Sequence, residues 1–249
     1  MNAFRWNNRT MDLKRTPIRE IIFTISFNET VDITTIGKFK NLPHISSQFP
    51  EAFQGYHADI KEIDGKKPRT SVSHDGYILK TNKIENRILH VRGGSFAFHK
   101  IKDYEKFDLL SKEFERYWLD FEKCVGHPLS VTMISVRYLN FIEKNSNESR
   151  QDLVNVYPSF PPLLSDKING FIHLKFKYPG NEFVNANIVT ADTKDDIGEG
   201  IILDIFLNRK INNEQDGEKI FRYLYDLREI KNNLFFNCVT SHMIKKYNQ

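Results

Sequence analysis

The sequence predicts an α+β fold with a large antiparallel sheet, in one or two layers, and two long amphipathic helices. Short runs of alternating apolar and polar residues recur along the chain, and turns that contain glycine separate them. Two longer stretches repeat apolar residues every three or four positions, as helices that cover a sheet do. The hydrophobic fraction of 40% and charged fraction of 27% are those of an ordinary globular protein.

The first elements follow a polar, basic lead-in at residues 1–16, which we expect to form a loose arm. Residues 18–27 alternate strictly and predict a strand with one strongly apolar face. Asp32 is a suitable N-cap for a short helix that follows. Residues 43–50, bounded by prolines, are expected to be irregular or to form one more helical turn.

An antiparallel meander is predicted next. Four alternating runs are its strands, at 56–63, 77–81, 87–92 and 96–101. The turns between the strands are predicted from Asp64-Gly65, Asp75-Gly76 and Gly93-Gly94.

Two long helices are the most distinct helical signals in the chain. Residues 103–125 carry a broad apolar stripe and end at Gly126, with Pro128 just beyond, which is a typical stop signal. The second helix runs from residue 218 to near the C-terminus, with a bend expected near Asn237. We expect its apolar, amide-rich part at 231–240 to pack in the core.

The segment between the two helices reads as further strands. A long strand is predicted at 129–143 and three shorter ones at 170–178, 182–191 and 200–207, with a loop at 144–152. Residues 158–162 are expected to be irregular because they contain three prolines.

The order of elements suggests one structural unit at 17–249 with two similar halves, 17–126 and 127–249. Each half begins with a strand and ends with a long helix. No flexible linker separates them, and no repeat is visible at the level of residues.

The chain lacks the motifs that specify a reaction. It has no phosphate-binding loop, no G-x-G-x-x-G, no C-x-x-C, no H-E-x-x-H and no G-x-S-x-G. We therefore predict no catalytic residues, metal site or cofactor, and we favour a role other than catalysis.

Localisation is predicted from the same composition. No apolar run approaches the ~20 residues that span a bilayer, and the segment at 1–6 has no secretory character. We expect a cytoplasmic protein without a membrane partner, in which Cys124 and Cys238 are buried, reduced thiols. The net charge of +4 permits binding to nucleic acid but does not require it.

Arg137 and Asp204 are single charges inside otherwise apolar strands. A buried charge is costly unless it is paired, so the simplest expectation is that the two side chains pair with each other or with the backbone, joined by Asn140. The functional alternative is a polar pocket for an anionic ligand, formed by Arg137, Tyr138, Asn140 and Asp204.

The first meander carries basic residues, and together with His44 just before it this region holds five of the eight histidines. A sheet face that mixes cations with aromatic rings can hold single-stranded nucleic acid. The candidate residues are Lys66, Lys67, Arg69, Arg87, His90 and Arg92. The alternative is a solvated sheet face with two charged turns. No two of these histidines show metal-ligand spacing.

Four short segments in this order carry a family resemblance: Pro17–Phe23, Arg137–Ile142, Leu203–Ile205 and Lys231–Thr240. Together they resemble an uncharacterised, sporadically distributed prokaryotic family of about 250–270 residues. Phe206 departs from that pattern, in which a second acidic residue is expected after Leu-Asp-Ile. The resemblance implies no established activity, although such families often accompany mobile elements or defence loci.

Two functions are therefore expected. The first is a non-enzymatic protein-interaction or ligand-sensing module, with another protein as its partner. The second is a nucleic-acid-binding protein that uses the basic strands of the first half. The sequence does not predict an oligomeric state.

Overall fold

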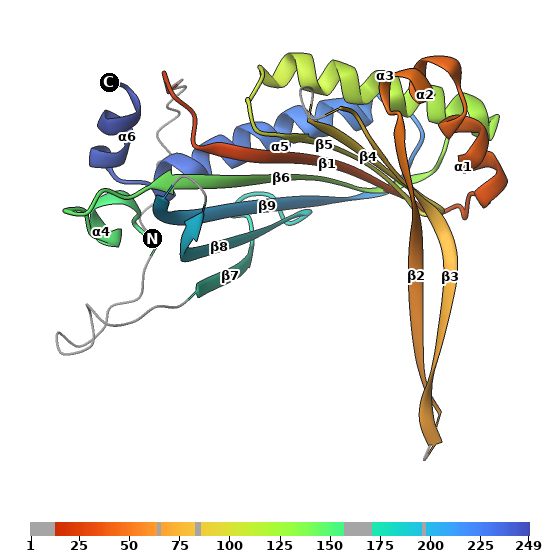
Figure 1. Ribbon diagram of the computed structural model, residues 1–249, viewed down its shortest axis with the longest axis horizontal. Helices are drawn as coiled ribbons and strands as arrows, with labels where there is room; N and C mark the ends of the chain where they lie inside the picture. The colour runs from red at the N-terminus through yellow and green to blue at the C-terminus, as the bar shows by residue number, and fades with distance from the viewer. Residues whose placement is uncertain (1–12, 64–65, 83–85, 157–170, 196–197) are drawn as a thin grey trace.

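The computed structural model describes residues 13–63, 66–82, 86–156, 171–195 and 198–249. Within them, nine strands form one antiparallel sheet in the order β2-β3-β4-β5-β1-β6-β9-β8-β7 (Figure 1). The predicted α+β class with a large antiparallel sheet is confirmed. The strands are β1 (Ile18–Phe27), β2 (Glu51–Ile63), β3 (Lys66–Lys80), β4 (Arg87–Arg92), β5 (Ser95–Ile101), β6 (Val131–Glu143), β7 (Phe171–Lys177), β8 (Val184–Asp195) and β9 (Gly198–Glu214).

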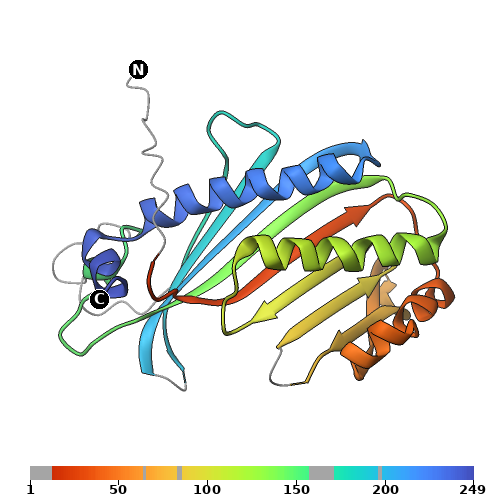
Figure 2. The ribbon, with the colours of Figure 1, turned by 90° about the horizontal axis from the view of Figure 1, so that it is seen from above.

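Two long helices, α3 (Phe107–Val125) and α5 (Gly217–Cys238), lie side by side on one face of the sheet (Figure 2). Asp216 caps the start of α5 by accepting hydrogen bonds from the N–H groups of Glu218 and Lys219. Gly126 ends α3 in the left-handed region with φ 95°, which glycine adopts without strain. The shorter helices are α1 (Ile33–Lys40), α2 (Pro43–Gln48), α4 (Arg150–Leu153) and α6 (Ser241–Tyr247).

The two halves of the chain place their elements in the same order. In each half the first strand, β1 or β6, lies at the centre of the sheet, and the remaining strands run outward to an edge. Each half then ends with a long helix on the same face. Because β1 and β6 pair with each other, one continuous sheet spans both halves. A common origin of the halves stays a prediction.

The core lies between the sheet and the long helices. On β1 the alternate residues Ile21, Phe23 and Ile25 are at most 1% exposed, because they point toward the helices. Phe23 packs edge-on against Phe107 and lies close to Phe114, both on α3. The apolar stripes predicted for the two helices are therefore the surfaces that cover this face of the sheet.

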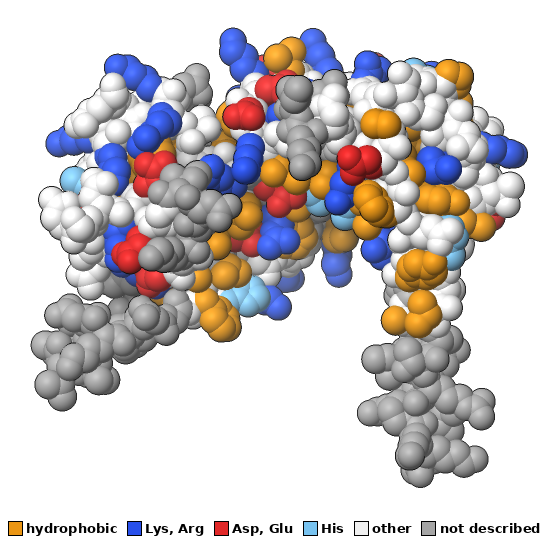
Figure 3. Space-filling model, viewed as in Figure 1, with side chains coloured by type: hydrophobic (Ala, Val, Ile, Leu, Met, Phe, Trp, Pro, Cys, Tyr) orange, Lys and Arg blue, Asp and Glu red, His pale blue; other side chains and the backbone are white. Residues whose placement is uncertain are grey.

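In the described part of the chain, no long helix covers the opposite face of the sheet (Figure 1). The β2–β3 hairpin extends away from the sheet on this side. The hairpin therefore borders this face, and Figure 3 shows the hollow between the face and the hairpin. We call this surface the open face.

Several predicted boundaries are wrong. The predicted turn at Asp75-Gly76 lies inside β3, which runs without a break from Lys66 to Lys80. Glycine is needed at position 76 for another reason, since a Cβ there would lie 2.0 Å from the carbonyl oxygen of Val91 on β4. The predicted loop at 144–152 contains the start of α4, and the bend expected near Asn237 is a break between α5 and α6.

Two further expectations concern cysteines and proline-rich chain. Both cysteines are free thiols, but Cys124 is half-buried whereas Cys238 is buried as expected. The segment at 158–162, expected to be irregular, lies outside the described residues. No helix in the described ranges is both long and apolar enough to cross a bilayer.

Candidate functional site

The open face is formed by the side chains that alternate with the core residues. One row of paired residues crosses eight of its strands, from β3 at one end to β7 at the other. Eight strands at about 4.8 Å spacing make the row about 34 Å long. In order, the row is Lys80, Ile88, His99, Ile22, Arg137, Phe206, Asn187 and Lys175.

Five polar side chains lie in a line across the centre of this face, one on each of five adjacent strands. They are His90, His99, Glu20, Arg137 and Asp204. The His90 and His99 rings lie 4.4 Å apart between centroids, and His99 Nδ1 lies 2.8 Å from Glu20 Oε1. Farther along, Arg137 donates from Nε and Nη2 to both oxygens of Asp204, at 2.6–3.0 Å. The strands that supply them are β4, β5, β1, β6 and β9, in sheet order.

The Arg137–Asp204 pair expected from the sequence is thus present. The Asp204 side chain is 9% exposed, whereas that of Arg137 is 47% exposed. Arg137 therefore compensates the charge of the nearly buried Asp204 carboxylate, while the Arg137 side chain itself remains half-exposed to solvent. The hydrogen bonds to Asp204 raise the pKa of Arg137, and the charge on Glu20 acts in the same direction.

The two histidines differ in their surroundings. Burial and the neighbouring His99 lower the pKa of His90 to about 4, because two protonated rings at this separation would repel. His90 is therefore neutral at physiological pH. His99 differs from His90 in having a carboxylate neighbour, since its Nδ1 lies within hydrogen-bonding distance of Glu20 Oε1.

The other two residues predicted for an anionic-ligand pocket do not belong to this cluster. Tyr138 and Asn140 alternate with Arg137 along β6, so they point toward the helices. Tyr138 lies under Lys231 of α5, and the Asn140 amide donates to the Leu203 carbonyl at 2.9 Å. The predicted four-residue pocket is therefore wrong, because a strand cannot place adjacent residues on one face.

The predicted nucleic-acid residues are likewise divided. His90 and Arg92 lie on the open face, and Arg92 forms an ion pair with Asp75 at 3.5 Å. Arg87 lies on the helix side, where it pairs with Glu105 and Glu113. Lys66, Lys67 and Arg69 belong to the far part of β3, whose side chains lie outside the described residues.

Four lysines on the open face were missed by the sequence reasoning. They are Lys80, Lys175, Lys177 and Lys210, and none of them forms an ion pair with a carboxylate in the described part of the chain. Lys80 lies instead over the ring of Phe53, 4.9 Å from its centroid. For two of these lysines the sequence did carry a signal. Lys175 and Lys177 alternate with the apolar Phe176, which packs on the core side, so strand alternation places both lysines on the opposite face.

Large apolar side chains are exposed at both ends of this face. Phe53 on β2 is 49% exposed, and Phe171 on β7 is 75% exposed. Phe171 pairs with Ala191 and therefore lies in line with the open-face residues Ile202 and Phe141. In Figure 3, hydrophobic, histidine and charged side chains gather under the sheet and on the hairpin beside it.

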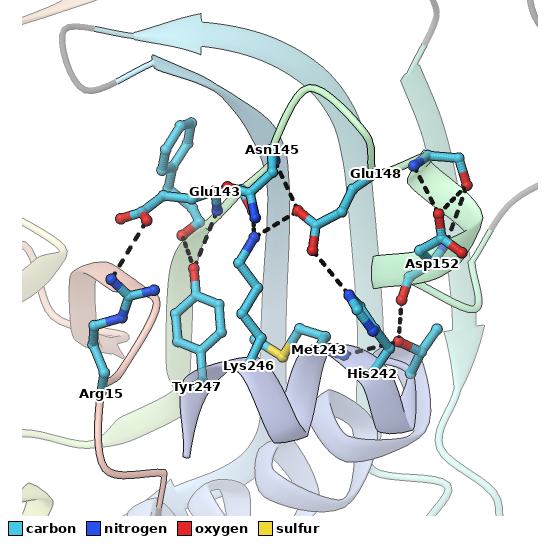
Figure 4. A network of polar contacts seen from close by, with 12 residues as sticks. Arg15, Glu143, Asn145, Glu148, Asp152, His242, Met243, Lys246 and Tyr247 are labelled. Carbon is cyan, nitrogen blue, oxygen red and sulfur yellow. Dashed lines mark hydrogen bonds and ion pairs between the residues drawn. The ribbon is translucent and has the colours of Figure 1, made fainter. Parts of the chain in front are cut away.

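A second polar cluster holds the C-terminal helix α6 against the end of β6 (Figure 4). Glu148 accepts hydrogen bonds from Lys246 Nζ at 2.6 Å, from the Asn145 N–H at 2.7 Å and from the His242 ring at 2.9 Å. Burial disfavours the charged carboxylate, but these partners outweigh burial and lower the pKa of Glu148 to about 2. Each carboxylate oxygen is already engaged, so this cluster is structural.

The open-face cluster is suited to binding. Its carboxylates are engaged by His99 and Arg137, and the described residues contain no group of three or more His, Cys, Asp or Glu placed to hold a metal ion. The exposed part of Arg137 and the unpaired lysines can receive anionic groups of a partner.

Comparisons with known proteins add no functional assignment. No family model matches the chain, and a search of curated proteins finds no match. Among solved structures, the chain is similar to the crystal structure of the di-domain ARO/CYC StfQ from the steffimycin biosynthetic pathway. That match has 10% identity and a TM-score of 0.21, and it covers 92% of this chain and 97% of the other. A TM-score this low carries no argument about function, and the family resemblance from the sequence stays a prediction.

Proposed function

We propose that this protein is a non-catalytic binding protein that holds a partner protein with an acidic surface against its open face. The observation that carries the proposal is the charge state of that face. Among its described carboxylates, Asp75 and Asp204 form ion pairs with arginines and Glu20 lies 2.8 Å from the His99 ring, whereas the exposed Glu51 lies opposite Lys80 in the β2–β3 register. The four lysines identified above outnumber Glu20 and Glu51, so the described part of this surface carries an excess of positive charge.

The distribution of apolar side chains supports a protein partner. Interfaces combine a few large anchoring side chains with a polar surround, and aromatic residues are enriched among the anchors. Phe53 and Phe171 are such exposed rings at opposite ends of the open face. Between them lies a polar centre whose side chains are held by ion pairs and hydrogen bonds, which lowers the entropy lost when a partner docks.

Charge complementarity specifies the partner further. Unpaired lysines at the rim of an interface speed association and select against basic surfaces. Lys175 and Lys177 stand on the edge strand β7, and Lys80 stands at the other end of the same row. We therefore expect the partner to present carboxylates over both ends of the row. A role in a defence or mobile-element locus stays a prediction.

The test is a binding measurement on a reconstituted complex. A protein that co-purifies from the host is produced separately, and its Kd is measured by calorimetry at 50 and 200 mM salt. The double variant Lys175→Glu/Lys177→Glu is compared with Leu109→Asp, a control on the exposed side of α3 where Leu109 is 59% exposed. We expect the double variant to weaken binding at least tenfold and the control to leave it unchanged. Weakening by the control alone would overturn the proposal.

Single-stranded nucleic acid is a second candidate, favoured by one observation. The row across the sheet interleaves cations with planar rings, since Lys80, His99, Arg137, Phe206 and Lys175 all lie on it. Backbone charge and base stacking would then supply the affinity. Fluorescence polarisation with a labelled 20-nucleotide oligothymidylate distinguishes the candidates. Tight binding that falls steeply between 50 and 200 mM salt would favour nucleic acid, because phosphate contacts release counterions.

A further inference from the structure

A third cluster of polar side chains lies on the helix side of the sheet, between α5 and β6. Lys231 occupies a core position of α5, in the buried stripe that also contains Leu227 and Leu234. Its side chain ends over the ring of Tyr138 on β6, with Nζ 4.0 Å from the ring centroid. This cluster faces away from the open face, so it is independent of the function proposed above.

This cluster contains a fully buried hydroxyl without a hydrogen-bonding partner and, beside it, a largely buried amine without a carboxylate. Tyr138 is 1% exposed, and its hydroxyl forms no hydrogen bond. Lys231 is 8% exposed and contacts the Tyr138 ring, but it forms no hydrogen bond or ion pair with any residue in the described ranges. Buried polar groups are nearly always satisfied, and each group left unpaired is destabilising.

The charges around the cluster are positive. Burial, together with the nearby charge of Arg228, lowers the pKa of Lys231 to about 7. The carboxylate that pairs with Arg228 belongs to Asp108, at 3.8 Å, and the Asp108 side chain is 60% exposed. Burial also raises the pKa of Tyr138 well above its ordinary value, so its hydroxyl keeps the proton and is a donor. The Lys231 amine and the Tyr138 hydroxyl are thus two neighbouring donors, with the positive charge of Arg228 nearby, and no described carboxylate accepts from either of them.

A carboxylate group has the chemistry that this cluster lacks. It offers two oxygens, each of which accepts hydrogen bonds, and its negative charge favours the protonated form of a neighbouring amine. A halide would offer a charge without two directed acceptors, and a neutral molecule would leave the amine uncompensated. The small exposed part of Lys231 marks the side from which such a group would enter.

We propose that Lys231 and Tyr138 form a binding site for the carboxylate group of a small organic acid. One oxygen accepts a hydrogen bond from the Lys231 ammonium group and the other from the Tyr138 hydroxyl. Arg228 adds favourable charge from the next turn of α5. The site would link binding of a small acid to the packing of α5 on β6.

The experiment uses acetate as the probe and chloride as the ionic control, on the full chain at pH 7. Binding is measured by calorimetry, and the pKa of Lys231 is followed by NMR of ¹³Cε-labelled lysine. We expect acetate, and not chloride, to bind and to raise the pKa of Lys231. Tyr138→Phe should weaken acetate binding at least tenfold, and Lys231→Met should abolish it.

The matched control is Lys219→Met, in the exposed first turn of the same helix, which should bind acetate like the wild type. Lys231→Met replaces the amine with an apolar side chain of similar length, so the variant should fold, and its unfolding transition checks this. Absence of acetate binding to the wild type would overturn the proposal. Equal binding to Lys231→Met, or an unchanged pKa of Lys231 at saturating acetate, would also overturn it.

Discussion

Glu148 provides the sharpest test of how the C-terminal helix is held. Its side chain is 8% exposed and is bonded to Lys246 and His242 of α6. We predict that Glu148→Gln destabilises the protein at neutral pH, because an amide cannot replace the charge that Lys246 pairs with. The same loss should occur in the wild type when acid protonates the carboxylate.

The magnitude follows from the lowered pKa. The pKa of Glu148 is about 2 in the folded protein against 4.5 for an ordinary glutamate, and a tenfold change in proton affinity corresponds to about 1.4 kcal/mol. The ionised carboxylate thus adds about 3 kcal/mol to the free energy of unfolding. The pKa is lower in the folded state, so this contribution is fully present above pH 4.5. It is lost as the pH falls from 4.5 toward 2, where the unfolded chain takes up the proton first.

Urea denaturation at pH 7, 5, 4 and 3 measures this effect. The wild type and Glu148→Gln should differ by about 3 kcal/mol at pH 7, and the difference should shrink below pH 4.5. Glu182→Gln, at an exposed position in the turn before β8, is the control and should track the wild type throughout. A difference at pH 7 below about 1 kcal/mol, or one that does not depend on pH, would refute the reasoning.

Three other predictions concern the sheet. Gly76→Ala should lower the free energy of unfolding by about 2 kcal/mol, because the added Cβ would clash with a backbone carbonyl oxygen. Gly94→Ala is the control, since an added Cβ there has no atom within 4 Å, and urea denaturation should find it near neutral. Arg137→Met should cost about 2 kcal/mol by leaving the Asp204 carboxylate unpaired, and adding Asp204→Leu should recover most of the loss in a double-mutant cycle. Because the pKa of His90 is lowered to about 4, stability should fall as the pH drops from 6.5 to 4, and His90→Phe should reduce that slope. An unchanged slope in this variant would contradict the assignment.

The fold was predictable because its signals are local and periodic. Alternation at 18–27 and the apolar stripe at 103–125 depend only on sequence, and both elements are found where expected, with α3 beginning at Phe107. The error at Asp75-Gly76 has a non-local cause. The pair resembles a turn, but the glycine serves the close approach of the Val91 carbonyl from β4, which sequence alone does not reveal.

The candidate site was only partly predictable for a similar reason. A lone charge in an apolar strand pointed to Arg137 and Asp204, and the two do pair. Adjacent residues such as Tyr138 were assigned to the same site although strand alternation sends them to the opposite face. His99 and Glu20 come from strands far apart in sequence, so their contact depends on the β1–β5 register.

The most direct test of the central claim, that the open face binds a partner protein, is hydroxyl-radical footprinting of the free protein and the reconstituted complex. In the free protein, Phe53, Phe171 and Leu109 are exposed and should all be oxidised. Binding at the open face predicts that Phe53 and Phe171 become protected while Leu109 on α3 keeps its rate. Protection of Leu109 with unchanged oxidation of Phe53 and Phe171 would place the partner on the helices and contradict the account.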